Sequence, residues 1–437
     1  MSVTQNARRL LVLVIMAVPA LAGAEGLLQL YDAAVESNPA FKSREFGVEQ
    51  AKAQKDLVRS RLLPQIKVDG SYDWNQFDQG DLASDYYNGT RGVVSARQPL
   101  FDLPSYHRLK GAQLAVEQSE FERTAAEMEL ATEVVDRYLT VLQADDELVY
   151  LQSEKAAIES QLKQLRFMRE RKLAKITDLY EVEAYYQGLL TREIEVQNAQ
   201  AIARERLRET TGVLASRVEP LVRDALPAAP GDEEQWVRDA VSRNPNLLAL
   251  GKASEAASRL VESGRAEYLP RLSLSASQIY ADQGYDNRQV PEYDVGTVGV
   301  VLSMPIYEGG RVQANVRDAT AKYRMSLEQY EAMRREIERS VRSAYLNAVA
   351  SYARMGSTAE ETRALEKVLE AQRKSYEYRI TTVLDVLIAQ RRLTKARSDE
   401  SKARYDYVRD LTVLKAHVGE PMRPHIEEVD GWMATDR

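Results

Sequence analysis

The sequence predicts a mainly α-helical protein with a small β part, built from two tandem copies of one structural plan. Three observations predict this architecture. Short motifs recur at a constant distance along the chain. Each half contains a run of 115 residues without proline, 105–219 and 306–420, in which apolar residues recur at helical spacing. Each half also contains short segments in which apolar and polar residues alternate, as they do in β-strands.

The composition excludes several classes of protein. The chain has 437 residues, a formal net charge of -7 and no cysteine, so disulfides, thiolate metal sites and lipid attachment through cysteine are excluded. Three histidines do not favour a multi-histidine metal site, and the negative charge does not favour nucleic acid as a partner. Because neither a Gly-rich phosphate loop nor a nucleophile–base motif is present, we expect no enzyme activity, no cofactor and no metal.

Residues 1–24 have the pattern of a secretory signal peptide. Arg8 and Arg9 precede an apolar stretch, 10–21, and residues 22–24 (Ala-Gly-Ala) form a typical cleavage site. The alternative is a membrane anchor, but the apolar stretch is shorter than the roughly 20 residues of a spanning helix. We therefore expect a cleaved signal peptide and an exported protein.

Three motif pairs indicate an internal duplication, because the members of each pair are 206 residues apart. They are Asn38-Pro39 with Asn244-Pro245, Leu63-Pro64 with Leu269-Pro270, and Gln98-Pro99 with Met304-Pro305. Farther along, Ile176-Thr177 is matched with Ile380-Thr381, 204 residues later. One nearly constant spacing over so much of the chain predicts two copies of the same fold.

The duplication divides the chain into consecutive parts. We expect the first structural repeat over 25–215 and the second over 232–420. The segment between them, 216–231, contains three prolines and is predicted to be a linker. Residues 421–437 remain as a C-terminal tail.

Each repeat is predicted to contain two strands joined by a polar loop. The expected strands are at about 65–76, 90–98, 271–281 and 294–304. Ile66, Val68, Tyr72 and Trp74 share one face of the first strand, and Lys67, Asp69 and Asp73 share the other. Such alternation with terminal aromatic residues is typical of membrane β-barrel strands, although a soluble hairpin packed on the helices would alternate as well. Because the smallest membrane barrels use about eight strands, four strands could span a membrane only in an oligomer.

A long helical hairpin is expected in each repeat, over 105–212 and 310–418. Ile337, Val341 and Tyr345 illustrate the apolar spacing of four residues. The first helix has no turn signal for roughly 70 residues, which at about 1.5 Å per residue gives a length of about 100 Å. Helices of this length exceed the thickness of a bilayer several-fold and would project to one side of it.

The order and spacing of further motifs identify a resemblance. Residues 305–311 (Pro-Ile-Tyr-Glu-Gly-Gly-Arg) connect a strand to a long helix, and residues 385–390 (Asp-Val-Leu-Ile-Ala-Gln) follow a helix–helix turn. Residues 173–178 (Leu-Ala-Lys-Ile-Thr-Asp) look like the other turn. Together with the duplication, which covers essentially the whole mature chain, these motifs resemble the TolC family of outer-membrane export ducts.

The resemblance implies a homotrimer. Three protomers would form one 12-stranded membrane β-barrel, continuous with a long periplasmic α-helical barrel. The protein would lie in the outer membrane of a Gram-negative cell, in contact with outer-membrane lipid, and span the periplasm. The implied partners are a periplasmic adaptor (membrane fusion) protein and an inner-membrane ABC or proton-driven transporter. The duct itself would be passive, and its partners would open it.

The sequence leaves the cargo open. Efflux ducts that resemble this chain commonly carry an N-terminal lipidated cysteine, which is absent here. That difference favours type I protein secretion or a general-purpose duct, with small-molecule (drug or metal) efflux as the alternative. A secreted coiled-coil scaffold or adhesin, with soluble β segments, is a remote alternative.

The resemblance also implies a periplasmic gate at the helix turns. The residues expected to form it are Asp178, Tyr376, Arg379 and Asp385. Thr381 occupies the position of the family's gate arginine, so Arg379 is expected to replace that arginine. For Asp385 two interpretations stay open, an acidic ring at the constriction or a carboxylate that stabilises a helix N-terminus. The turns expected to contact the adaptor contain Leu173, Ala174, Lys175, Ile176, Thr177, Ile380, Thr381 and Thr382.

Overall fold

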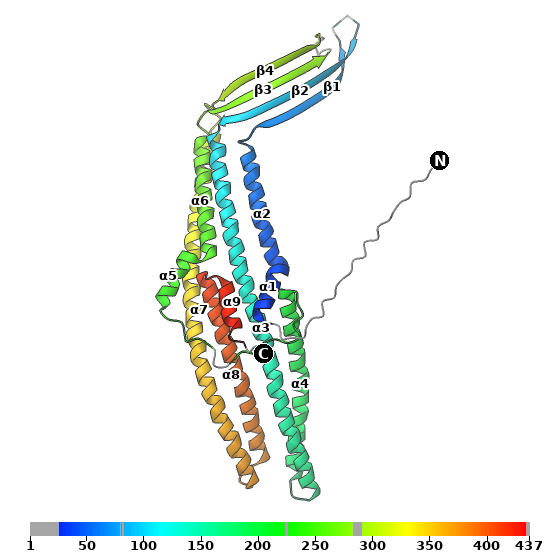
Figure 1. The fold of residues 1–437 in the computed structure, drawn as a ribbon, viewed down its shortest axis with the longest axis vertical. Helices are drawn as coiled ribbons and strands as arrows, with labels where there is room; N and C mark the ends of the chain where they lie inside the picture. Colours follow the sequence, from blue (N-terminus) through cyan, green and yellow to red (C-terminus); the bar gives the residue numbers. More distant parts are fainter. Residues whose placement is uncertain (1–25, 79, 81–82, 223–225, 283–290, 434–437) are drawn as a thin grey trace, which may run out of the picture.

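A computed structural model describes most of the chain. The described residues are 26–78, 80, 83–222, 226–282 and 291–433. The predicted signal peptide, 1–24, lies outside them, as does most of the expected loop between the third and fourth strands. The molecule is a long rod of helices with a four-stranded sheet at one end (Figure 1). None of the described helices combines the length and the apolar character needed to cross a membrane.

The two repeats contain the same elements in the same order. The first repeat comprises α1 (Leu27–Ser37), α2 (Pro39–Ser60), β1 (Gln65–Phe77), β2 (Asp85–Phe101), α3 (Leu103–Glu170) and α4 (Ile176–Thr211). The second comprises α5 (Glu233–Arg243), α6 (Pro245–Ala266), β3 (Arg271–Asp282), β4 (Tyr293–Ser303), α7 (Arg311–Glu377) and α8 (Val383–Val418). A further helix, α9 (Met422–Asp430), lies in the segment expected as a tail. With 68 residues, α3 is about 100 Å long, as expected from its sequence.

The sheet joins the two repeats. Its strand order is β1-β2-β3-β4, all neighbours are antiparallel, and β2 of the first repeat pairs with β3 of the second. Strand β2 begins earlier than the expected residue 90, because Asp85 and Tyr87 pair with Phe77 and Asn75 of β1. Within the described residues, β1 and β4 each have a neighbouring strand on one side only.

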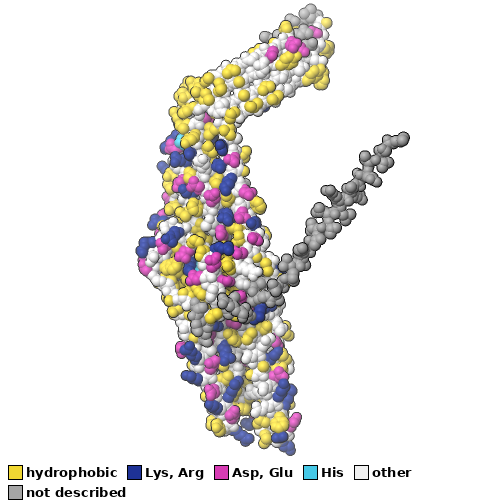
Figure 2. Space-filling model, viewed as in Figure 1, with side chains coloured by type: hydrophobic (Ala, Val, Ile, Leu, Met, Phe, Trp, Pro, Cys, Tyr) yellow, Lys and Arg dark blue, Asp and Glu magenta, His cyan; other side chains and the backbone are white. Residues whose placement is uncertain are grey.

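One face of the sheet is apolar and exposed. The register places Val68 beside Val94, and Leu274 beside Val300, on the same face. Ile66 is 75% exposed, Trp74 80% and Val298 77%. The sheet extends beyond the helices instead of lying on them, and apolar side chains cover much of its visible surface, whereas charged groups crowd the helical rod (Figure 2). A soluble hairpin packed on the helices would bury this face, so the structure contradicts that alternative.

The opposite face of the sheet is polar along β1. Lys67 and Asp69 form an ion pair of 2.6 Å on this face of β1. Arg91 of β2 lies opposite Ser71 in the same register. The alternation predicted for the first strand therefore separates an apolar face from a face with charged groups.

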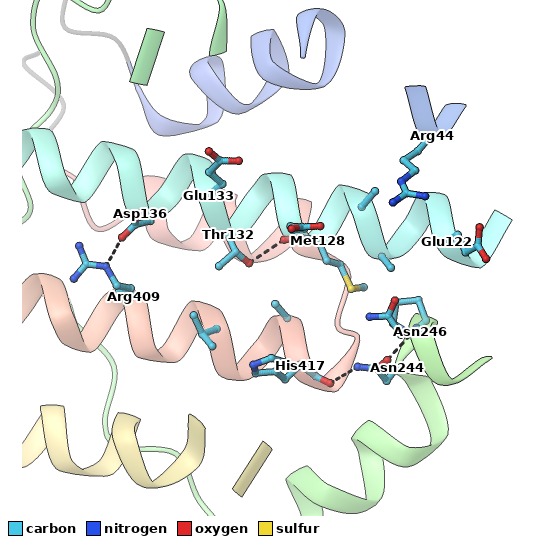
Figure 3. A pocket seen from close by; sticks show the side chains of 16 residues that line it. Arg44, Glu122, Met128, Thr132, Glu133, Asp136, Asn244, Asn246, Arg409 and His417 are labelled. Atoms are coloured by element: carbon cyan, nitrogen blue, oxygen red, sulfur yellow. Dashed lines mark hydrogen bonds and ion pairs between the residues drawn. The ribbon is translucent and has the colours of Figure 1, made fainter. Parts of the chain in front are cut away.

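The Asn-Pro motifs join helices end to end. Asn38 accepts hydrogen bonds from the first backbone N–H groups of α2 and donates one of 3.1 Å to the Thr210 carbonyl near the end of α4. Asn244 likewise caps α6 and donates to the His417 carbonyl of α8 over 2.7 Å (Figure 3). The prolines occupy the first turn, where a missing N–H costs no helical hydrogen bond. The motif therefore attaches the start of α2 to the end of α4, and the start of α6 to the end of α8.

The main hydrophobic core lies around α1 and α9, near the middle of the rod (Figure 1). It contains buried residues of α1, α3, α4, α8 and α9, among them Tyr31, Tyr138, Leu207, Tyr407 and Ile426. The segment predicted to be a linker packs against this core. The Tyr407 hydroxyl donates to the Ala228 carbonyl over 2.8 Å, and the Glu219 amide donates to the Tyr138 hydroxyl over 2.8 Å. The linker therefore runs across the helices and helps to hold the two repeats together.

Candidate functional site

The predicted gate and tip residues lie at the end of the rod opposite the sheet, where the α3–α4 and α7–α8 turns are located (Figure 1). Both turns have the same backbone. Lys172 and Arg379 adopt left-handed conformations, with φ of 58° and 61°. The following amide in each turn bonds to the carbonyl five residues earlier, Leu173 to Met168 and Ile380 to Ser375. This is the Schellman arrangement, which satisfies the last carbonyl groups of a helix.

The turns correct the sequence alignment of the two repeats. Lys172 and Arg379 are 207 residues apart, and so are the first residues of α4 and α8, Ile176 and Val383. The match of Ile176-Thr177 with Ile380-Thr381 at 204 residues is therefore wrong by three positions. An Ile-Thr dipeptide is too short to define a register, whereas the position of the left-handed residue is determined by the end of the helix.

The structure brings Tyr376 and Asp178 close together. Tyr376 is half-buried near the end of α7 and packs against two apolar clusters. Burial raises the pKa of its phenol, and the negative charge of Asp178 at the start of α4 raises it further. The tyrosine therefore keeps its proton and can donate a hydrogen bond across the interface between the two hairpins.

Arg379 is not paired with Asp178 in this chain. The guanidinium belongs to an exposed turn, and no ion pair among the described residues joins it to Asp178. The Asp178 carboxylate accepts a long hydrogen bond of 3.4 Å from the Thr177 hydroxyl. The expected link is thus absent among the described residues of the single chain.

Asp385 caps α8. Its carboxylate accepts hydrogen bonds from the Thr382 amide, at 2.9 Å, and from the Thr382 hydroxyl, at 2.6 Å. The Asp385 amide donates back to the Thr382 hydroxyl, which completes a capping box. These bonds to the Thr382 side chain and backbone hold the pKa of the Asp385 carboxyl below its usual range. Within the single chain the helix-capping interpretation of Asp385 therefore applies.

The tip turns present an apolar surface. Leu173, Ile176 and Ile380 are exposed there, as are the neighbouring Tyr378 and Leu384. Lys175 is exposed at the N-terminus of α4, and Ala174 packs partly against an apolar cluster. Thr381 has a buried hydroxyl without a hydrogen-bond partner among the described residues. Exposed apolar side chains gathered at this end of the rod favour contact with another protein.

The sequence analysis missed an apolar contact between the two hairpins. Val383 is fully buried and Leu387 is 4% exposed. Both belong to an apolar cluster whose other buried members, including Leu165 and Val182, lie on α3 and α4. We call this the tip contact (Val383 and Leu387 with Leu165 and Val182). The spacing of four residues could have identified a buried face of α8, but not the helices that cover it.

A cavity of about 890 Å³ lies away from the tip, where α2, α3, α6 and α8 meet (Figure 3). Asp136 and Arg409, which line it, form an ion pair of 2.5 Å. His417 also lines it, and burial lowers the pKa of this imidazole, with a smaller contribution from the charge of Arg339. The cavity is therefore a groove where helices of both repeats meet, and it includes no predicted gate residue.

Comparisons with known proteins agree with this architecture. The family model described as outer membrane efflux protein matches residues 30–213 and 236–420, one match in each repeat. The outer membrane protein TolC of Vibrio cholerae is 29% identical over 412 residues, which cover 93% of each chain. The alkaline protease secretion protein AprF of Pseudomonas aeruginosa is 29% identical over 406 residues, covering 90% of this chain and 84% of that protein. A crystal structure of CusC superposes with a TM-score of 0.80 at 18% identity, over 91% of this chain and 93% of the other.

Proposed function

The chain belongs to the outer membrane efflux protein family, and on that basis we propose how it assembles, what closes it and what it exports. It is the outer-membrane channel of an export system, located in the outer membrane and spanning the periplasm. This identification decides against a secreted scaffold or adhesin. The family is one of channel proteins rather than enzymes. We propose that this chain, too, is passive, and that a periplasmic adaptor and an inner-membrane transporter supply the energy.

The proposed assembly is a homotrimer in which the sheets close into one barrel. The observation that carries the proposal is an exposed apolar sheet face whose outer strands, β1 and β4, each lack a second neighbour within the described residues. Joining β4 of one protomer to β1 of the next would satisfy these edges and turn the apolar face towards lipid. We expect the mass of the protein in detergent to be three times that of the protomer. A stable monomer that inserts into membranes would contradict this assembly.

The two faces of β1 should differ in their access to water. We expect single cysteines at Lys67, Asp69 and Asp73 to react with a water-soluble maleimide faster than cysteines at Ile66, Val68 and Trp74, because lipid would shield the apolar face. The native chain has no thiol, so the unmodified protein is the background control. Similar rates on both faces of the strand would count against a membrane-spanning sheet.

We propose that Tyr376, Arg379 and Asp178 hold the periplasmic end closed and that Asp385 influences its ion preference. A solvated ion pair contributes only about 0–1 kcal/mol, but three symmetric copies could shift a two-state opening by a few kcal/mol. We expect Arg379→Ser with Tyr376→Phe to raise single-channel conductance and to sensitise cells to large antibiotics. Unchanged conductance of this double variant would mean that other residues hold the periplasmic end closed.

The test of Asp385 must separate the effect of its negative charge from the effect of its helix-capping hydrogen bonds. Asp385→Ala removes both, whereas Asp385→Asn removes the charge and keeps an oxygen that can accept from the Thr382 amide. If the carboxylate favours cations at the constriction, both variants should lower cation selectivity and block by polyvalent cations. An effect of the alanine variant alone would assign Asp385 to helix capping.

For the cargo we propose polypeptides, with small molecules as the alternative. AprF is named as an alkaline protease secretion protein and PrtF of Dickeya chrysanthemi as a proteases secretion protein, at 29% and 24% identity, whereas CusC, named for cation efflux, is 22% identical. The chain also lacks the lipidated cysteine that is common in related efflux ducts, which likewise favours polypeptides as cargo. The test is deletion of the gene, followed by analysis of extracellular proteins and of drug and metal sensitivity. Loss of secreted polypeptides without hypersensitivity supports the proposal, and the reverse pattern supports efflux.

A further inference from the structure

A small basic cavity lies where the sheet meets the helices. Its volume is about 170 Å³, several times the roughly 30 Å³ that one water molecule occupies. Three arginines line it: Arg61 from the end of α2, Arg97 from β2 and Arg271 from the start of β3. Three arginines from three separate elements, which belong to both repeats, therefore line one cavity.

Among the described residues that line this cavity, Asp102 is the one acidic residue, and its carboxylate already accepts hydrogen bonds. Its carboxylate accepts hydrogen bonds from the Ser105 amide, at 3.2 Å, and from the Ser105 hydroxyl, at 2.7 Å, and so caps α3. Its distance to Arg271 Nε is 3.9 Å, which is too long for a hydrogen bond. The three arginines and one carboxylate leave a net charge of +2 at the cavity.

The guanidinium groups have unused hydrogen-bonding capacity. Arg271 Nε is buried and has no hydrogen-bond partner among the described residues. Arg61 and Arg97 are exposed, and among the described residues their side chains take part in no hydrogen bond or ion pair. A buried guanidinium N–H without an acceptor is unfavourable, so an anionic acceptor in the cavity would be stabilised.

The position of the cavity indicates a soluble ligand. Arg97 lies opposite Gln65 of β1 and Ser275 of β3, and its side of the sheet is the polar face that carries Lys67 and Asp69. The apolar face, proposed to contact lipid, is on the other side. The N-terminus of α3 also adjoins the cavity through Phe101 and Asp102, and its dipole favours negative charge.

We propose that this cavity is a binding site for a tetrahedral oxyanion, represented by inorganic phosphate. The planar forks of Arg61, Arg97 and Arg271 suit the several acceptor oxygens of such a group. The buried Ser273 also lines the cavity, and its hydroxyl adds a possible donor. The site belongs to one protomer, so the proposal does not depend on transport.

The test is isothermal titration calorimetry of the purified full-length protein in detergent. Sodium phosphate is titrated into the protein in Tris-chloride buffer, and sodium chloride of equal ionic strength is titrated in a parallel control. We expect saturable binding of phosphate and no saturable heat from chloride. Arg97→Gln and Arg271→Gln should each weaken phosphate binding about tenfold or more, because each removes a charge-assisted contact. Arg97→Lys should have a smaller effect, since it keeps the charge and loses the fork.

Arg59→Gln is the matched control. Arg59 is exposed two residues before Arg61 on the same helix and does not line this cavity, so its loss should leave binding unchanged. Circular dichroism at 222 nm verifies that each variant is folded. Equal binding by the wild type and the folded Arg97→Gln and Arg271→Gln variants would overturn the proposal. A saturable signal with phosphatidylglycerol in mixed detergent micelles but not with inorganic phosphate would also overturn it, because the ligand would then be a lipid.

Discussion

Replacing Leu387 with alanine should open the periplasmic end of the duct. Leu387 is 4% exposed and belongs to the tip contact, where α8 meets α3 and α4. Truncation of a buried leucine costs about 2–5 kcal/mol. If the closed arrangement depends on this contact, a loss of only about 2 kcal/mol changes the ratio of closed to open states roughly thirty-fold. We therefore expect higher single-channel conductance in planar bilayers and greater sensitivity of cells to large antibiotics.

Two residues of the same helix provide controls for Leu387. Leu393 is also buried, but its cluster consists of residues of α7 and α8 alone, so Leu393→Ala should destabilise that hairpin without loosening it from α3 and α4. Leu384 is exposed, and its truncation should change conductance little. If Leu393→Ala raised conductance as much as Leu387→Ala does, general loss of helix packing would explain the effect, and the tip contact would have no special role.

Gly419→Ala should lower the thermal stability of the protein substantially. Gly419 ends α8 with φ of 85°, a conformation that costs other residues about 1–2 kcal/mol. A Cβ atom would also lie 2.5 Å from the Arg243 carbonyl oxygen and 3.0 Å from Asn244 Cα, where α6 is seated on α8. Backbone cannot move away as a flexible side chain could, so a further cost of about 1–3 kcal/mol is expected. The measurement is thermal unfolding monitored by circular dichroism in detergent.

Gly310 separates the two contributions to the effect at Gly419. It has nearly the same φ, 84°, at the N-terminus of α7, but a Cβ atom there would have no neighbour within 4 Å. Gly310→Ala should therefore show the conformational cost alone and a smaller decrease in apparent Tm. An equal decrease for both variants would mean that the close packing of α6 against α8 contributes nothing to stability.

The periodic features of the chain could be predicted well from sequence because they arise from local geometry. The alternation of Ile66, Lys67 and Val68 follows from the pleat of a strand, and it predicted the two faces of the sheet. The absence of proline from 105–219 predicted long helices, since each interior proline would break the hydrogen-bond ladder. The Asn-Pro pairs identified the duplication, although their role in connecting helix ends became visible only in the structure.

The candidate site was predicted less completely, because its residues meet across long distances in the sequence. The sequence by itself determined that Tyr376 and Asp178 lie near helix turns, and their proximity was expected from the resemblance alone. Only the tertiary structure decided that Asp385 bonds to Thr382 and that Val383 and Leu387 pack against the other hairpin. Periodicity shows that a helix has a buried face, but the partner of that face depends on how elements about 200 residues apart pack in three dimensions.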